Sequence, residues 1–344
     1  MERRLSENNG KAPAIEARGL TRTFKGDIEA VRGVDLQVSK GEIFGFLGPN
    51  GAGKSTTVRM LCTLLPPTDG SASVAGHDVV ADGDDVRRSI GVALQEIGLD
   101  PVQTGRELLE LQCGLYGIAG AAGRDRTNEL LELVGLTDAA DRRTKTYSGG
   151  MKRRLDLASA LVHQPEVLFL DEPTTGLDPA SRLTVWEEVR SINATGTTIF
   201  LTTQYLEEAD ELCQRLAIID RGEIVAEGTP EKLKGDLGND VVTVQLKGAD
   251  PDKTVAAIGE LPGLERVVPA EDALALYVED GAASIAAIVG RLHAAGVDVG
   301  AIAVDQPSLD DVFLEATGRR LEGAREGEDL GVEQDEAAAR ALTP

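Results

Sequence analysis

A glycine-rich segment between an apolar run and a helical pattern constrains the fold of this chain more than any other feature. Residues 42–47, which are apolar after Glu42, lead directly into residues 48–56, which have the spacing G-x(4)-G-K-S. Glycines let backbone N–H groups surround phosphate oxygens, and the start of the following helix is electropositive. The spacing predicts a phosphate-binding loop between a buried strand and a helix that ends near Leu65, before two prolines.

Two side chains of this loop have separate expected tasks. Lys54 supplies a positive charge for the β- and γ-phosphates of a nucleotide, and the Ser55 hydroxyl is the hard oxygen ligand that Mg²⁺ prefers. The predicted nucleotide-binding residues of the loop are Gly48, Pro49, Asn50, Gly51, Ala52, Gly53, Lys54, Ser55 and Thr56.

A second apolar run, residues 167–170, ends in the carboxylates Asp171 and Glu172. Taken alone, two acids at a strand end are also typical of a solvated turn or a helix cap. Beside a phosphate-binding loop, however, they favour a catalytic pair. Asp171 is expected to hold Mg²⁺, through water, and Glu172 to polarise a water for attack on the γ-phosphate.

A third segment, Ser148-Gly149-Gly150, precedes a helical pattern over residues 152–162. A hydroxyl and glycine amides at a helix N-terminus are suited to a further phosphate group. Most such triplets are simple turns, but this one lies about 20 residues before the strand that ends at Asp171. We therefore include Ser148, Gly149 and Gly150 among the candidate nucleotide-binding residues.

The order of elements predicts an α/β fold with buried parallel strands. The runs 167–170 and 198–201 are almost wholly apolar, and a crossover helix is expected between them at 180–192. Alternating residues at 14–38 predict antiparallel strands, and leucine spacing at 104–146 predicts a helical region.

A turn-rich segment near residues 235–239 separates a second region. Its elements are predicted in the order β-α-β-β-α-β, which is the ferredoxin-like α+β motif. They are expected at 241–246, 253–258, 264–268, 274–278, 282–295 and 297–304, with a last helix at 309–316. The predicted domains are 14–235 and 240–318, followed by an acidic disordered tail at 319–344, and residues 1–12 are also expected to be disordered.

The charge of the chain excludes several classes of partner. There are 35 Lys and Arg against 58 Asp and Glu, a formal net charge of -23. This balance argues against nucleic-acid binding and against adhesion to anionic lipid. No run approaches the roughly 18 apolar residues of a membrane span, so no direct lipid insertion is expected. The first 11 residues lack a secretory pattern, and the three cysteines are expected to be buried thiols of a cytosolic protein.

A local cluster of basic residues surrounds Ser148. One interpretation is a solvated helix face, and the other is a local field that attracts a nucleotide. The cluster contains Arg142, Arg143, Lys145, Lys152, Arg153 and Arg154.

These motifs together resemble the nucleotide-binding subunit of ATP-binding cassette (ABC) transporters over residues 14–235. Ser148-Gly149-Gly150 matches the family signature Leu-Ser-Gly-Gly-Gln, with Tyr147 and Met151 in place of the outer residues. The resemblance implies a RecA-like core with an antiparallel β subdomain and a helical subdomain. It also implies ATP and Mg²⁺ as ligands, and a homodimer in which each ATP lies between Lys54 of one cassette and Ser148 of the other.

The resemblance assigns roles to further residues. Gln95 falls at the Q-loop, which links Mg²⁺ and water to the membrane partner, and Asp178 falls at the D-loop. Phe24 is where the family stacks an aromatic ring on adenine, although an ordinary core aromatic remains the alternative. The expected metal ligands are Ser55, Gln95 and Asp171. Gln204 replaces the usual His; its amide donates hydrogen bonds but carries no charge, so slower hydrolysis is expected.

Three segments are similar to the daunorubicin-resistance ATPase subfamily: residues 147–151, residues 202–210 and residues 307–314. This similarity implies an ATPase that energises export of a drug or antibiotic through a separate integral-membrane permease, at the cytoplasmic face of the cell membrane. It also suggests that the C-terminal region supports assembly with that permease. The alternatives are an importer ATPase, a soluble non-transport cassette, and a degenerate cassette that only binds.

Overall fold

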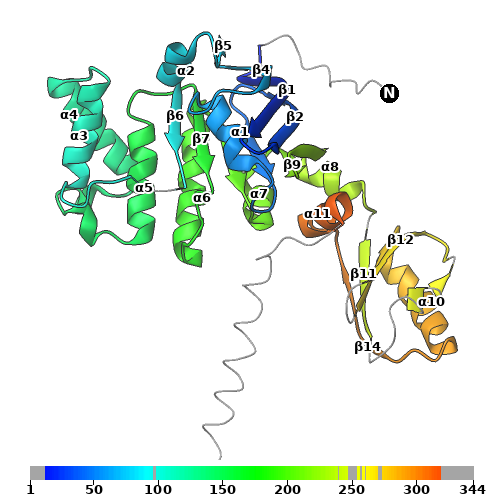
Figure 1. Ribbon diagram of the computed structural model, residues 1–344. Coiled ribbons are helices and arrows are strands. Elements are labelled where there is room, and N and C mark those ends of the chain that lie inside the picture. The colour runs from blue at the N-terminus through cyan, green and yellow to red at the C-terminus, as the bar shows by residue number, and fades with distance from the viewer. Residues whose placement is uncertain are drawn as a thin grey trace, which may run out of the picture. The chain divides into compact units, whose positions relative to one another are not determined.

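The computed structural model describes residues 12–318, apart from 96–97, 239, 247–253, 256–257, 260 and 270–272 (Figure 1). The described residues form two compact units that divide at Gly228. The predicted disorder at 1–12 and 319–344 concerns segments that lie, except for residue 12, outside the described residues. The predicted domain boundaries, with the first domain ending at residue 235 and the second beginning at residue 240, stay a prediction. None of the described helices has the length and apolarity needed to cross a membrane.

The first unit is built on a six-stranded sheet with the order β10-β9-β3-β8-β7-β6. The strands from β9 to β6 are parallel, and every residue of β3, β7 and β8 is buried, as expected for a sheet covered on both faces. The carboxyl ends of β3, β7 and β8 therefore meet at one edge. The strands are β3 (Ile43–Leu47), β6 (Ile90–Ala93), β7 (Val167–Asp171), β8 (Thr198–Thr203), β9 (Arg215–Asp220) and β10 (Glu223–Gly228).

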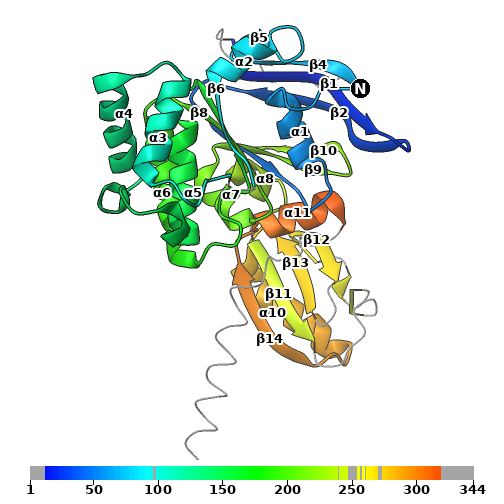
Figure 2. The same cartoon turned by 60° about the vertical axis from the view of Figure 1, so that its left-hand side comes forward.

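A second, antiparallel sheet has the order β2-β1-β4-β5 and confirms the prediction for residues 14–38. Figure 2 shows α1 beside the strands β1 and β2. The inner side chains of this sheet share one apolar core with α1 and the central strands. Helix α1 ends at Leu61, before the predicted Leu65, because Thr63 adopts a positive φ of 61°. The elements are β1 (Ile15–Phe24), β2 (Ile28–Val38), α1 (Lys54–Leu61), β4 (Asp69–Val74), β5 (His77–Asp78) and α2 (Gly83–Ser89).

The helical region lies to one side of the six-stranded sheet, where α3 and α4 stand beside α5 (Figure 1). A capping box at Thr104 and Glu107 begins α3. Helix α5 begins at Gly149, earlier than the predicted residue 152, because the Ser148 side chain caps it. The helices are α3 (Gly105–Leu115), α4 (Gly120–Leu133), α5 (Gly149–Ala160), the crossover α6 (Pro179–Ala194) and α7 (Leu206–Leu212), with short 3-10 turns at Thr137–Ala139 and Thr144–Thr146.

The second unit confirms the predicted ferredoxin-like sheet, with the order β12-β13-β11-β14 and antiparallel neighbours. Helix α10 packs on the apolar side chains of this sheet. Of the first predicted helix, at 253–258, residues 254, 255 and 258 are described and are helical, and the other three residues lie outside the described residues. The elements are α8 (Pro230–Gly235), β11 (Asp240–Leu246), β12 (Leu264–Pro269), β13 (Ala273–Val278), α10 (Gly281–Ala294), β14 (Val299–Asp305) and α11 (Leu309–Thr317).

Candidate functional site

The phosphate-binding loop joins β3 to α1 at the edge where the central strands end. Gly53, just before α1, has φ 111°, and a Cβ there would lie 2.6 Å from the Ala30 carbonyl oxygen, so no other residue fits without a shift. The Lys54 side chain is buried and donates to the Gly48 carbonyl oxygen at 2.6 Å. Its Nζ also lies 3.3 Å from Glu172 Oε1. Lys54 therefore connects the loop to Glu172, the residue that follows β7.

Burial lowers the pKa of the Lys54 ammonium, and the neighbouring carboxylates of Glu172 and Asp171 oppose that lowering. Two acids around one buried lysine keep a positive charge available at the loop. That charge is what nucleotide phosphates require.

The predicted metal ligands Ser55 and Asp171 lie together. Ser55 Oγ donates to Asp171 Oδ1 at 3.3 Å, and the Thr202 hydroxyl of β8 donates to the same carboxylate oxygen. Asp171 is 4% exposed. A buried cluster of hard oxygens, one of them an ionisable carboxylate, fits Mg²⁺. Thr202 was not predicted as part of this cluster; the register that pairs Asp171 with Thr202 places it there.

Glu172 occupies an unusual backbone position. Its φ is 50°, in the left-handed region that costs a non-glycine residue roughly 1–3 kcal/mol. Its N–H donates to the Thr202 carbonyl and hydroxyl oxygens. Its carboxylate lies beside Lys54 and accepts from Gln95 Nε2 at 3.4 Å and from the Thr175 hydroxyl at 3.3 Å. The structure thus brings the predicted Gln95 and Glu172 together, with Thr175 as an additional partner.

The segment around Ser148 forms the start of α5. Ser148 is exposed, and its Oγ accepts from the Met151 N–H at 3.2 Å. Gly150 is buried, and a Cβ there would lie 2.9 Å from Ser181 Oγ. Ser181 donates to Asp178, which caps α6 and whose pKa is lowered by these hydrogen bonds. The predicted signature and D-loop residues therefore meet at two neighbouring helix starts.

Tyr147, which replaces the leucine of the family signature, is a buried anchor. Its hydroxyl donates to the Ala139 carbonyl oxygen at 2.7 Å, and burial raises the pKa of its phenol. A Cβ at Gly105 would lie 2.6 Å from this hydroxyl. Tyr147 thus fastens the segment before α5 to the rest of the helical region.

Phe24 is exposed and Gln204 is half-buried. Phe24, at the end of β1, is 38% exposed, and the Arg22 guanidinium lies 4.9 Å from the centre of its ring. One face of the ring is therefore covered by a cation. Gln204 directly follows β8, on the same edge as Asp171 and Lys54.

The basic cluster around Ser148 is not the uniform solvated face that one interpretation expected. Arg153 is 3% exposed and Arg154 is half-buried. Arg153 donates to three backbone carbonyl oxygens, and Arg154 donates to the Val134 carbonyl oxygen. Both side chains are directed inward because buried carbonyl groups need donors. The three cysteines are buried, as predicted.

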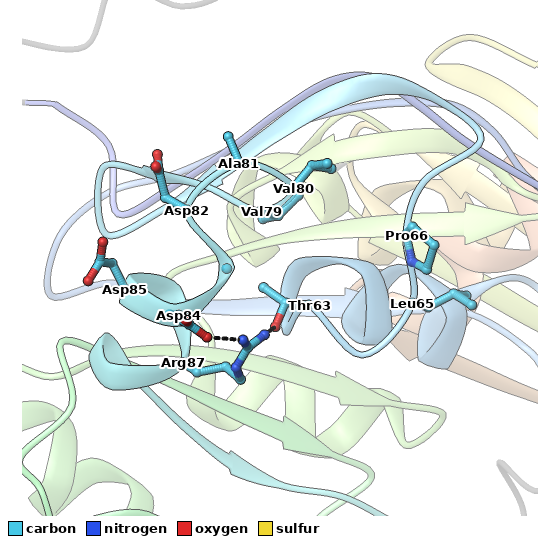
Figure 3. A pocket seen from close by; sticks show the side chains of 11 residues that line it. Thr63, Leu65, Pro66, Val79, Val80, Ala81, Asp82, Asp84, Asp85 and Arg87 are labelled. Carbon is cyan, nitrogen blue, oxygen red and sulfur yellow. Dashed lines mark hydrogen bonds and ion pairs between the residues drawn. The ribbon is translucent and has the colours of Figure 1, made fainter.

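A cavity of about 530 Å³ lies at the C-terminal end of α1, the opposite end from the phosphate loop. Figure 3 shows Arg87 directed toward Asp84 and Thr63, and it donates to the Thr63 hydroxyl at 2.7 Å. The lining contains none of the predicted site residues. The candidate site is therefore the sheet edge, not this cavity.

Comparison with known proteins agrees with this geometry. Residues 31–175 match the family model described as ABC transporter, and residues 228–317 match that of the ATP-binding protein DrrA1-3-like C-terminal domain. The chain is 44% identical over 321 residues to the daunorubicin/doxorubicin resistance ATP-binding protein DrrA of Streptomyces peucetius, covering 90% of this chain and 94% of that one.

The chain belongs to the ATP-binding subunits of ABC transporters. This ABC subunit is also 46% identical to the doxorubicin resistance ATP-binding protein DrrA of Mycobacterium tuberculosis, covering 88% of this chain and 93% of that one. It is 37% identical to the linearmycin resistance ATP-binding protein LnrL of Bacillus subtilis, covering 89% of this chain and 99% of that one.

A solved dimeric ATP-binding cassette in a post-hydrolysis state, bound to ADP and Pi, is 28% identical to this ABC subunit with a TM-score of 0.57. The match covers 62% of this chain and 98% of that one. These relatives confirm the predicted family, the cassette fold and the ATPase class of the enzyme.

Proposed function

We propose that this ABC ATPase energises export of a drug- or antibiotic-like hydrophobic compound through a separate integral-membrane permease, at the cytoplasmic face of the cell membrane. The observation that carries the proposal is the joint arrangement of Lys54, Asp171 and Glu172 at one sheet edge in a chain related to resistance and export subunits over most of its length. The arrangement of the three residues supports hydrolysis, and the similarity to resistance and export subunits supports the direction of transport.

The proposed reaction uses the residues at this edge. Lys54 and the loop amides bind the β- and γ-phosphates of ATP, and Phe24 stacks on adenine with the ring face that Arg22 leaves open. Ser55, Asp171 and Gln95 would hold Mg²⁺, which neutralises charge on the phosphates. Glu172 accepts the proton of the attacking water, and Gln95 orients that carboxylate.

The second half of each ATP site is proposed to come from another copy of the chain. Ser148, Gly149 and Gly150 present a hydroxyl and amides at the exposed start of α5, next to Asp178. In a head-to-tail homodimer these groups bind the γ-phosphate held by the partner loop. Closure on ATP and opening after hydrolysis then drive the permease.

The test is reconstitution of the full chain with a candidate membrane permease, in vesicles whose lumen contains the ATPase, ATP and daunorubicin as the probe. We expect ATP-dependent efflux, and we expect Glu172→Gln to keep ATP binding while removing most turnover and efflux. Lys40→Gln, which alters an exposed pair with Glu166, is the control and keeps both activities. ATP-dependent uptake, or turnover with no movement of any probe compound, would contradict the export assignment.

A further inference from the structure

Arg153 is a buried cation that the proposed reaction does not use. It lies in α5, the helix that begins at the signature segment, and its side chain is 3% exposed. Its guanidinium donates to the Asp171 carbonyl oxygen at 3.1 Å and to the Pro173 carbonyl oxygen at 3.0 Å. These two carbonyl groups flank Glu172 on either side. The guanidinium therefore holds the backbone on both sides of Glu172, whose φ is 50°.

The same guanidinium reaches the start of the Q-loop. Nη1 of Arg153 donates to the Leu94 carbonyl oxygen at 2.6 Å, and the next residue is Gln95. Gln95 in turn donates to the Glu172 carboxylate. One planar group with several donors thus holds the main chain on both sides of the Gln95–Glu172 contact, a geometry that arginine satisfies and lysine does not.

The charge of Arg153 is balanced within the same helix. Asp156, one turn further along α5, lies 3.3 Å from Nη1, and burial raises the pKa of Asp156 to about 6 against the opposing effect of Arg153. The three main-chain acceptors take up most of the remaining donors. A buried cation held by several such bonds is expected to move together with α5.

We infer that Arg153 is a positioning residue that holds the strained backbone of Glu172 and the start of the Q-loop in register with the signature helix. Its substitution lets the Glu172 carboxylate leave its place beside Lys54 and Gln95. Ser148 caps α5, and the Arg153 side chain transmits a displacement of this helix to Glu172. The inference rests on the proposed role of Glu172 in hydrolysis.

The test is a double-mutant cycle on the full chain, with single-turnover ATP hydrolysis, ATP affinity and melting temperature as readouts. We expect Arg153→Gln to lower the hydrolysis rate about 100-fold, the effect of a misplacement near 1 Å, while ATP affinity changes little because the Lys54 loop is untouched. Arg153→Lys restores part of the rate. In the Glu172→Gln background, Arg153→Gln adds almost no further loss, because the group that it positions is already gone.

The matched control is Arg154→Gln, in the same helix. Arg154 also donates to a backbone carbonyl oxygen, that of Val134, and lies 3.8 Å from Glu188, but it holds no carbonyl group beside Glu172. It is expected to lower the melting temperature and to leave the hydrolysis rate of folded protein unchanged.

Two results would overturn the inference: an unchanged rate in Arg153→Gln, or an equal loss in the wild-type and Glu172→Gln backgrounds, which is what a merely structural anchor produces. If Arg153→Gln does not fold, Arg153→Lys carries the same cycle. Full turnover in Glu172→Gln alone would instead contradict the proposed function, so the two failures are distinguishable.

Discussion

Two helices of the cassette begin at segments suited to phosphate, and their surroundings differ. At the start of α1, the helix itself contributes the buried Lys54 and the Ser55 hydroxyl, and the end of β7 contributes the carboxylates of Asp171 and of Glu172, which follows it. At the start of α5, the chain offers the exposed hydroxyl of Ser148, two glycines and a capped neighbouring helix. The first site has the charges for catalysis within one chain, whereas the second has only donors. This difference supports the proposal that the start of α5 completes an ATP site on a second copy of the chain.

The largest expected effect comes from removing the charge at the first helix. Lys54→Ala is predicted to lower ATP turnover by about 1000-fold, since a preorganised donor at the transferred phosphoryl group is lost. The matched control is Lys40→Ala, an exposed lysine paired with Glu166, which is expected to keep wild-type turnover. Turnover in Lys54→Ala near that of the control would remove Lys54 from the site.

The second helix is tested by Ser148→Arg, predicted to lower turnover about 100-fold by blocking the donor of the partner site. Mixing the two inactive variants tests directly whether the starts of α1 and α5 share one nucleotide. A dimer of Lys54→Ala with Ser148→Arg contains one intact composite site, so the mixture is expected to hydrolyse ATP faster than either variant alone. Activity that does not rise on mixing, in dimers shown to exchange subunits, would mean that the two helices do not share a nucleotide.

A titrating carboxyl lies beneath the second helix. Burial raises the pKa of Glu188, on α6, from 4.5 to about 8, against the opposing effect of Arg154 on α5. The folded state therefore holds a proton that the unfolded state releases, and stability falls as the pH rises from about 4.5 to about 8.

Glu188→Gln is predicted to stabilise the protein by about 2 kcal/mol at pH 8 and to change little at pH 4. Denaturant unfolding at several pH values measures this difference. A gain of the same size at pH 4 would point to packing instead of titration.

The edge of the first site is tested at Gln204. Gln204→Ala is predicted to lower turnover about tenfold, the loss of a neutral hydrogen bond near the γ-phosphate. Gln204→His is expected to equal or exceed the wild type, because imidazole also donates and can carry a proton. Steady-state ATP hydrolysis decides this, and an alanine variant as fast as the wild type leaves Gln204 without a role.

The smallest effect is expected at Tyr147→Phe. Loss of the hydroxyl leaves the Ala139 carbonyl oxygen without that donor and is predicted to cost about 1 kcal/mol of unfolding free energy. Turnover of the folded protein should not change, because the ring still fills its site. A fall in turnover without a fall in stability would show that the signature segment, and not only its support, depends on this hydroxyl.

Much of the architecture could be predicted because the signals are local. The strands that end at Leu47, Asp171 and Thr203 are buried and mostly apolar, which is typical of parallel strands. The C-terminal pattern of strands and helices predicted the ferredoxin-like order. Helix ends were less accurate. Helix α1 ended early at the left-handed Thr63, and α5 began early at its Ser148 cap.

The sequence by itself determined the phosphate loop, the paired acids and the family, since residue type and spacing carry that information. Only the tertiary structure decided that Arg153, expected in a surface cluster, is buried and holds the chain around Glu172. Its partners Leu94, Asp171 and Pro173 accept through backbone carbonyl oxygens. Every residue has such a carbonyl group, so no side chain in the sequence marks which ones a distant arginine will find.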